Sequence, residues 1–86
     1  MPRYHVILVD RVAKALDALH PEGRQRIRAK LEALAGNPRP PGVVRLVGEG
    51  GHYRVRVGDY RIVYTIRDQA LLVLILRVAH RREVYG

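Results

Sequence analysis

The sequence predicts an α+β fold, a two-layer sandwich in which a helical hairpin packs on one face of a mainly antiparallel sheet. Three observations predict it. Two alternating runs of β-branched, aromatic and arginine residues flank Gly58-Asp59, which is a two-residue turn signal. Two segments with apolar residues at helical spacing precede these runs, and a nearly continuous apolar run, Leu71–Val78, follows them. The expected order of elements is β-α-α-β-β-β-β.

The first twenty residues predict a strand and a short helix. The run Arg3–Val9 contains enough β-branched and aromatic residues for a half-buried strand. Asp10 is the expected N-cap, because its side chain can accept a hydrogen bond from the first free N–H groups of a helix. That helix is expected over about Arg11–Leu19. Its apolar face is expected to carry three residues at helical spacing, Val12, Leu16 and Leu19.

A second helix is expected to begin at Pro21, since proline is favoured at the first helical position. Glu22 follows in the first turn, where a carboxylate suits the helix dipole. The sequence Gly36-Asn37-Pro38 is a typical helix end. The apolar stripe of this helix holds Ile27, Leu31 and Leu34. The two helices together predict a short αα-hairpin.

The second half of the chain predicts four strands joined by short turns. A short strand is expected over Val43–Val47, and the second strand of the hairpin is expected to run to about Arg67. Asp68-Gln69-Ala70 is expected to turn the chain. The apolar run Leu71–Val78 then predicts a central strand that is covered on both faces for much of its length.

The hairpin carries an unusual group of arginines. With a two-residue turn, Arg56 lies opposite Arg61, and residues two apart share a face, so Arg54 joins them on what we call the arginine face. Like charges directly opposite on a sheet are destabilising, so these guanidinium groups favour an anion, and their planar forks match phosphate oxygens. The alternative is a solvated outer face. The other face is expected to pack on the helices and carries Val55, Val57, Tyr60, Ile62 and Tyr64.

The composition bounds the class of protein. Eighty-six residues are expected to form one domain, and the absence of cysteine excludes a disulfide framework and a thiolate site. We find no signal peptide and no apolar run long enough for a membrane span, and we expect a cytoplasmic location. Sixteen Lys+Arg against eight Asp+Glu give a net charge of +8. This balance favours a polyanionic partner, with a generally basic, soluble surface as the alternative.

The tail adds further candidate groups. The last strand is expected to run antiparallel to the strand with Arg61, so its end returns to the arginine face. There His80 is a candidate proton donor or acceptor, because histidine changes charge near neutral pH. Arg81 and Arg82 add cations, and Tyr85 adds a ring that can stack on a base. These are the groups that RNA cleavage without a metal requires. We expect no cofactor, and no two histidines have the spacing of metal ligands.

Two motifs resemble the RelE branch of the RelE/ParE toxin superfamily: YRVRVGDYRIVY at residues 53–64, and VAHRREVY at residues 78–85. The resemblance covers essentially the full length. It implies the toxin of a type II toxin–antitoxin pair, which cuts mRNA in the ribosomal A site by 2′-OH attack on the phosphate. It also implies an acidic RelB-like antitoxin that wraps the domain, and contact with operator DNA only through that antitoxin.

The resemblance also implies roles for single residues. Arg54 and Arg56 would contact the phosphate, one of them as the base, and Arg61 would stabilise the transition state. Arg81 would bind phosphate and help to protonate the leaving group, and Tyr85 would stack on a base. Further RNA contacts are expected from Arg45, Arg77 and Arg82.

One departure from the family concerns the general base. Family members often carry lysine at the positions of Arg54 and Arg56, and arginine gives up a proton far less readily. This raises His80 as the candidate base. Two other functions stay open: a ParE-like poison of DNA gyrase, and a binding module without enzymatic activity.

Overall fold

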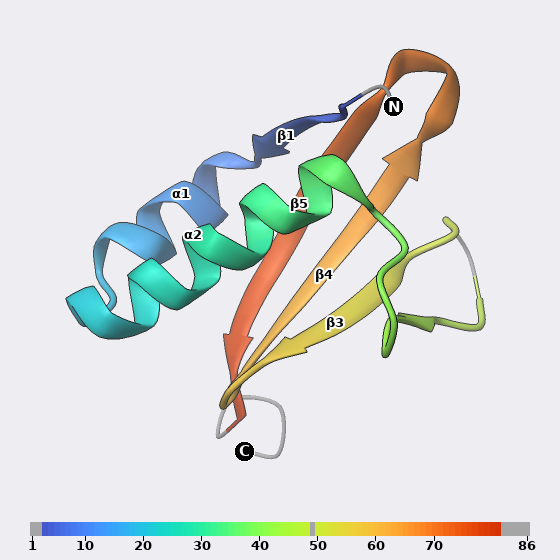
Figure 1. Cartoon of the computed structure of the whole chain (residues 1–86). Helices are drawn as coiled ribbons and strands as arrows, with labels where there is room; N and C mark the ends of the chain where they lie inside the picture. Colours follow the sequence, from blue (N-terminus) through green and yellow to red (C-terminus); the bar gives the residue numbers. More distant parts are fainter. Residues whose placement is uncertain (1–2, 49, 82–86) are drawn as a thin grey trace.

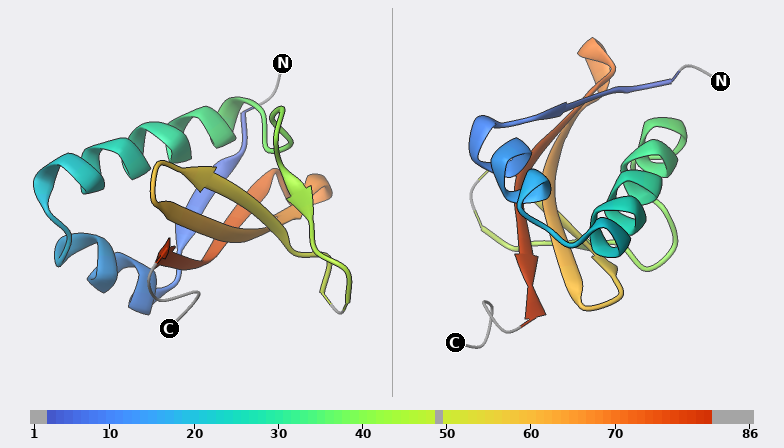
Figure 2. Two further views of the ribbon diagram at one scale, coloured as in Figure 1. Left: turned by 90° about the horizontal axis from the view of Figure 1, so that it is seen from below. Right: turned by 90° about the vertical axis from the view of Figure 1, so that its left-hand side faces the viewer.

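The computed structural model describes residues 3–48 and 50–81. Two helices pack on one face of a five-stranded mixed sheet (Figures 1 and 2). This confirms the predicted fold class and order of elements. The elements are β1 (His5–Leu8), α1 (Asp10–Asp17), α2 (Pro21–Gly36), β2 (Val44–Arg45), β3 (Tyr53–Val57), β4 (Tyr60–Arg67), a 3₁₀ turn (Asp68–Ala70) and β5 (Leu72–His80).

The strand order across the sheet is β1-β5-β4-β3-β2. The three pairs β2–β3, β3–β4 and β4–β5 are antiparallel, and β1 is parallel to β5. The last strand therefore lies between the first strand and the hairpin, which confirms an interior strand. The predicted cover on both faces is wrong, because both helices pack on one face and the other face of β5 is only partly buried. A parallel partner is possible because the helical hairpin supplies the long connection that such pairing requires.

The core lies between the helices and the near face of the sheet. α1 contributes Val12 and Leu16, which are the buried residues of its predicted apolar face. The predicted stripe of α2 is also buried, and it meets buried residues of β3, β4 and β5. The α2 residues are Ile27, Leu31 and Leu34, and the strand residues are Val55, Ile62, Tyr64, Val73 and Ile75.

The hairpin has the register that the two-residue turn predicts. Val57 pairs with Tyr60, and Arg56 pairs with Arg61. Gly58 has φ +58°, a left-handed value that favours glycine and explains the Gly-first turn. The face with Val55 is buried beneath the helices, as the alternation predicts.

Several predicted boundaries are wrong. Asp10 is the first residue of α1, which Val9 precedes as the N-cap, so its carboxylate acts on the helix dipole and caps no N–H group. α1 ends at Asp17 because Pro21 disfavours helical backbone at the residue before it. β2 spans two residues instead of Val43–Val47, because its pairing with β3 ends where a glycine-rich loop with left-handed backbone begins.

A β-bulge interrupts β5. Tyr64 of β4 pairs with Ile75, but the neighbouring Val63 pairs with Arg77, so Leu76 is an extra residue without a partner on β4. A shift of one residue moves every following side chain to the opposite face of the sheet. The second half of β5 therefore has the opposite side-chain orientation to that of an unbroken strand.

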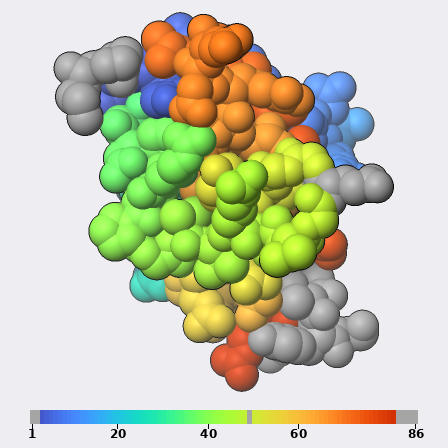
Figure 3. Space-filling view, turned by 90° about the vertical axis from the view of Figure 1, so that its right-hand side faces the viewer, coloured from blue at the N-terminus to red at the C-terminus, as the bar shows by residue number. Residues whose placement is uncertain are grey.

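An ion pair joins the loop after α2 to the turn between β4 and β5. Arg39 donates two hydrogen bonds to the carboxylate of Asp68, at 3.0 and 2.9 Å, and a third to the hydroxyl of Tyr53 at 3.3 Å. The hydroxyl of Tyr4 donates to the same carboxylate at 2.7 Å. The segment that follows α2, coloured green, consequently covers the middle of the molecule on its β2 side (Figure 3).

A buried tyrosine of the core also holds this loop, through a hydrogen bond. Tyr64 is fully buried, and its hydroxyl donates to the carbonyl of Pro38 at 2.7 Å. Burial, followed by the nearby Tyr53, raises the pKa of Tyr64 to about 12. The hydroxyl therefore keeps its proton and remains a donor at any pH at which the protein would be studied.

The Arg39–Asp68 ion pair makes stability depend on acid pH. The hydrogen bonds from Arg39, followed by that from Tyr4, lower the pKa of Asp68 from 3.8 to about 2. A lowered folded pKa stabilises the protein above the unfolded value and loses this effect as pH falls through the folded value. We expect Asp68→Asn to unfold at a lower temperature than the wild type at pH 6. The gap should shrink between pH 4 and pH 2.

Thermal unfolding followed by circular dichroism at several pH values measures that gap. Glu32→Gln is a matched control, because Glu32 pairs with Arg3 on the surface, where both side chains are largely exposed and an ion pair contributes little. A gap for Asp68→Asn that stayed constant from pH 6 to pH 2 would contradict the assignment.

Candidate nucleic-acid interface

Two rows of paired residues lie on the sheet face that points away from the helices. One row runs from Arg56 through Arg61 to Ala79, and the next runs from Arg54 through Val63 to Arg77. Cross-strand partners share a face, so β5 adds Arg77 to the predicted arginine face. The bulge makes this possible, because an unbroken strand would aim Arg77 toward the helices.

The hairpin cavity lies where β3, β4 and the end of β5 meet. It has a volume of about 370 Å³ and is lined by Arg56, Gly58, Asp59, Tyr60, Arg61 and Arg81. The backbone N–H of Arg81 donates to the carbonyl of Asp59 at 2.6 Å, which holds the end of β5 against the hairpin turn. Three arginines therefore share one cavity, although Arg81 lies 20 residues after Arg61 in the chain.

A second cavity adjoins the first along β3. Its volume is about 280 Å³, and its lining consists of Gly42, Val44, Arg54, Arg56 and Arg61. Arg56 and Arg61 line both cavities, so the two hollows share a wall of guanidinium groups. Together they form a continuous cationic surface on the arginine face.

Three arginines of this surface, Arg54, Arg56 and Arg81, take no part in the ion pairs Arg3–Glu32 and Arg39–Asp68 of the described residues. Arg56 is exposed, and Arg54 and Arg61 are half-buried, so their guanidinium groups border solvent and one another. Closely spaced guanidinium groups with few carboxylate partners attract an anion, and phosphate fits their paired N–H groups best.

The structure corrects the placement of two candidates. His80 pairs with Tyr60, and its ring packs edge-on against that tyrosine, with centroids 5.1 Å apart and an angle of 84°. His80 thus lies on the helix-side face of the sheet, because the bulge reversed the alternation of β5. Arg45 pairs with Tyr53 and shares its helix-side face as well.

The other candidates have different outcomes. Arg54, Arg56, Arg61 and Arg81 lie on or beside the arginine face as expected, and the bulge adds Arg77 to it. Arg82 and Tyr85 lie outside the described residues. The sequence reasoning missed the carbonyl of Asp59 as the anchor of Arg81. The signals that could have indicated this contact are the alternation of the hairpin and the position of its turn at Asp59.

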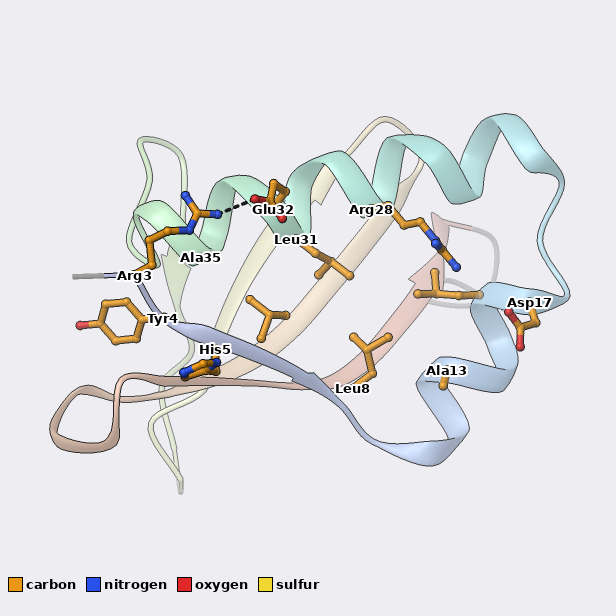
Figure 4. A pocket seen from close by; sticks show the side chains of 12 residues that line it. Arg3, Tyr4, His5, Leu8, Ala13, Asp17, Arg28, Leu31, Glu32 and Ala35 are labelled. Carbon is orange, nitrogen blue, oxygen red and sulfur yellow. Dashed lines mark hydrogen bonds and ion pairs between the residues drawn. The ribbon is translucent and has the colours of Figure 1, made fainter. Parts of the chain in front are cut away.

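A cavity elsewhere in the described structure is lined by charges of both signs. This cavity, of about 680 Å³, lies between β1 and the two helices (Figure 4). Leu8 and Leu31 point into it, while Arg28 and Asp17 lie toward the loop between the helices. Charges of both signs line this groove, so it does not select anions. Within residues 3–48 and 50–81 there is also no cluster of three metal-ligating side chains.

No helix of the described chain is long and apolar enough to cross a membrane.

Comparisons with known proteins agree with this geometry. The family described as the ParE toxin of the type II toxin–antitoxin system parDE matches residues 6–85. The chain belongs to this family. Within the superfamily it lies in the RelE branch, because it is 31% identical to a chain of the archaeal RelE–RelB complex. RelE1 of Methanocaldococcus jannaschii is 29% identical over 86 residues, 96% of each chain.

Two solved structures of the RelE branch have the same fold. One is the archaeal RelE–RelB complex from Pyrococcus horikoshii, at TM-score 0.82 and 31% identity, which covers 94% of this chain and 97% of the other. The second is the toxin–antitoxin complex RelBE2 from Mycobacterium tuberculosis, at TM-score 0.83 and 30% identity, which covers 94% of both chains. The toxin family and the fold predicted from the sequence are thus confirmed.

The arginine face should bind phosphate in the absence of RNA. We expect inorganic phosphate to raise the melting temperature of the wild type, because a ligand of the folded state stabilises it. Arg56→Ala removes a charge-assisted hydrogen-bond donor worth about 1.5–3 kcal/mol, so phosphate affinity should fall about tenfold or more. Arg45→Ala removes the same charge from the other face and should leave affinity unchanged. Equal losses in the two variants would contradict the placement.

Proposed function

We propose that this protein is a ribosome-dependent mRNA endonuclease, the toxin of a type II toxin–antitoxin pair. The observation that carries the proposal is the hairpin cavity, which is lined by Arg56 of β3, Arg61 of β4 and Arg81, the residue after β5. Membership of a toxin family supports it, as does the high net positive charge. RNA and the ribosome are both polyanions, and they act in the cytoplasm.

Cleavage of the RNA phosphodiester depends above all on stabilisation of the negative charge that develops in the transition state. The 2′-oxygen attacks the adjacent phosphorus, a P–O2′ bond forms, and the P–O5′ bond breaks to leave a 2′,3′-cyclic phosphate and a 5′-hydroxyl. Negative charge grows on the non-bridging oxygens and then on the leaving 5′-oxygen. Arg56 and Arg61 would stabilise the first charge, and Arg81 would stabilise the second. Arg54 would hold the neighbouring phosphate from the second cavity.

Two roles expected at the outset remain predictions. The role of Tyr85 as a stacking ring stays a proposal, because that residue lies outside the described part of the chain. The role of His80 in proton transfer also stays a prediction: its ring packs against Tyr60 on the helix-side face, and Tyr60 in turn lines the hairpin cavity. The charge-stabilising arginines are therefore the centre of the proposed mechanism.

The proposed partner is a RelB-like antitoxin. The similar proteins from P. horikoshii and M. tuberculosis were both solved as complexes with antitoxins. An antitoxin that presents acidic side chains to the arginine face would neutralise the charges that bind RNA. Contact with operator DNA would then come through the antitoxin, because the toxin's own cationic face would be covered.

Gyrase poisoning is the second candidate function, because the matching family description is that of ParE toxins. The two candidates make opposite predictions in two assays. The nuclease should cut mRNA in a ribosome-containing translation extract and leave gyrase supercoiling intact. A gyrase poison should inhibit supercoiling and leave the mRNA whole.

Removal of single arginines should separate catalysis from folding. We expect Arg61→Ala and Arg81→Ala each to lower the rate of mRNA cleavage about 10²–10³-fold, the usual effect of losing one preorganised donor to a transition-state oxyanion. Arg45→Ala is the matched control and should cut like the wild type. Primer extension on mRNA from the extract measures the cuts. Folded wild-type protein that produces no cuts on ribosomes would refute the proposed function.

A further inference from the structure

An arginine of α1 donates a hydrogen bond to a backbone carbonyl of the bulge in β5. The guanidinium of Arg11 donates to the carbonyl of Leu76, the extra residue of the bulge, at 3.3 Å. β1 has ended by this point, and the N–H of Val9 makes the last contact with β5, to the carbonyl of Ile75 at 3.2 Å. The first turn of α1 therefore takes the place of β1 beside the second half of β5.

A cavity opens between that turn of α1 and β5. This bulge cavity has a volume of about 400 Å³ and is lined by Arg11, Val12, Ala15, Arg77 and Val78. Val12 is buried and Val78 is half-buried, so the floor is apolar. Arg11 and Arg77 are exposed, so the two charged groups of the lining reach solvent.

Neither arginine has a carboxylate partner within the described chain. The ion pairs there are Arg3–Glu32 and Arg39–Asp68. The single hydrogen bond from Arg11 to Leu76 uses one of its five N–H donors. Two cations over an apolar floor match a unit that carries one negative charge on a largely uncharged frame, such as a nucleotide.

The bulge cavity is connected to the arginine face through Arg77. This residue is on the same row as Arg54, with Val63 between them, so the two backbones lie two strand spacings apart, about 10 Å. A chain with a charge on every unit can contact Arg54 and Arg77 in succession. A polymer that enters the hairpin cavity can therefore continue over Val63 into the bulge cavity.

We propose that the bulge cavity is a second phosphate-binding site, which holds the phosphodiester backbone of single-stranded RNA that continues beyond the arginine face. The proposal rests on the proposed function, because it takes RNA as the ligand. RNA is favoured over an acidic protein segment because the cations follow a path from one proposed phosphate site to the next. The bulge then has two effects: it aims Arg77 outward, and its free carbonyl positions Arg11.

Binding without cleavage tests this site. Two single-stranded RNAs with 2′-O-methyl groups serve as probes, since they lack the attacking 2′-hydroxyl. The short one has about four nucleotides and the long one about twelve, which brackets usual single-strand site sizes. Fluorescence anisotropy at several salt concentrations gives the affinity and its salt dependence for each.

Arg77→Ala should weaken binding of the long RNA about tenfold. The slope of log affinity against log salt concentration should fall by about 0.7, the effect of one lost phosphate contact on a single strand. The short RNA, which fills the hairpin cavity alone, should bind as it does to the wild type. Arg11→Ala should behave likewise, and Arg11→Lys should keep most of the affinity because the charge remains. Arg28→Ala is the matched control, since Arg28 is an exposed arginine that lines the groove between β1 and the helices.

Several results would overturn the site. Arg77→Ala could bind the long RNA as Arg28→Ala does, or it could lose the short and long RNAs equally. Its affinity for a polyglutamate peptide could also fall more than its affinity for RNA, which would assign the cavity to an acidic protein. A wild type that binds neither RNA would have the same consequence.

The failures of the two proposals are distinguishable. If the wild type cuts mRNA on ribosomes while Arg77→Ala binds the long RNA normally, only the second site is refuted. If the wild type shows the length-dependent loss on Arg77→Ala but never cuts mRNA, the nuclease function is refuted and the binding site stands. Within the described residues the side chain of Arg77 takes part in neither ion pair, and circular dichroism verifies that the variant is folded.

Discussion

The orientation of side chains at the site depends on one extra residue in β5. Strand β5 must carry apolar residues into the core in its first half and Arg77 away from the helices in its second half. Strict alternation cannot do both from this sequence, because Ile75 and Arg77 would then share a face. With Leu76 unpaired on the β4 side, Ile75 stays in the core and Arg77 points outward. Arg11 stabilises the displaced carbonyl, so helix α1 is part of the same arrangement.

Elements whose determinants lie within a few residues could be predicted from the sequence. The hairpin register follows from Gly58-Asp59 and alternation, and every predicted pair is present. The stripe of α2 follows from its helical spacing in the same way. The positions of His80 and Arg45 could not be derived so simply. His80 changes face because of a bulge that leaves no local pattern in an apolar run, and Arg45 depends on where a two-residue strand pairs.

The loop after α2 shows a second limit of local reasoning. Its prolines and glycine indicate only irregular backbone, yet the loop is held at two points by distant residues. Arg39 binds Asp68, which is 29 residues away, and the carbonyl of Pro38 accepts from the buried Tyr64. In the sequence, Asp68 looks like any surface carboxylate and Tyr64 looks like any core tyrosine. Because the same loop brings Gly42 and Val44 to the second cavity, these contacts also shape the cationic surface.

The removal of His80 from the arginine face changes what this site can do alone. Guanidinium groups stabilise the charge of a transition state, but they are poor proton acceptors because they are almost never deprotonated. An arginine site therefore accelerates the reaction mainly after the 2′-OH has been brought in line with the phosphorus. Alignment by itself is worth a large part of such a barrier, since a well-oriented attack needs no further ordering of the reactants. A ribosome that holds mRNA in a fixed conformation can supply that alignment, whereas free RNA cannot. The proposed dependence on the ribosome thus follows from the chemistry of the cavity: the toxin provides the cations, and the substrate complex provides the geometry.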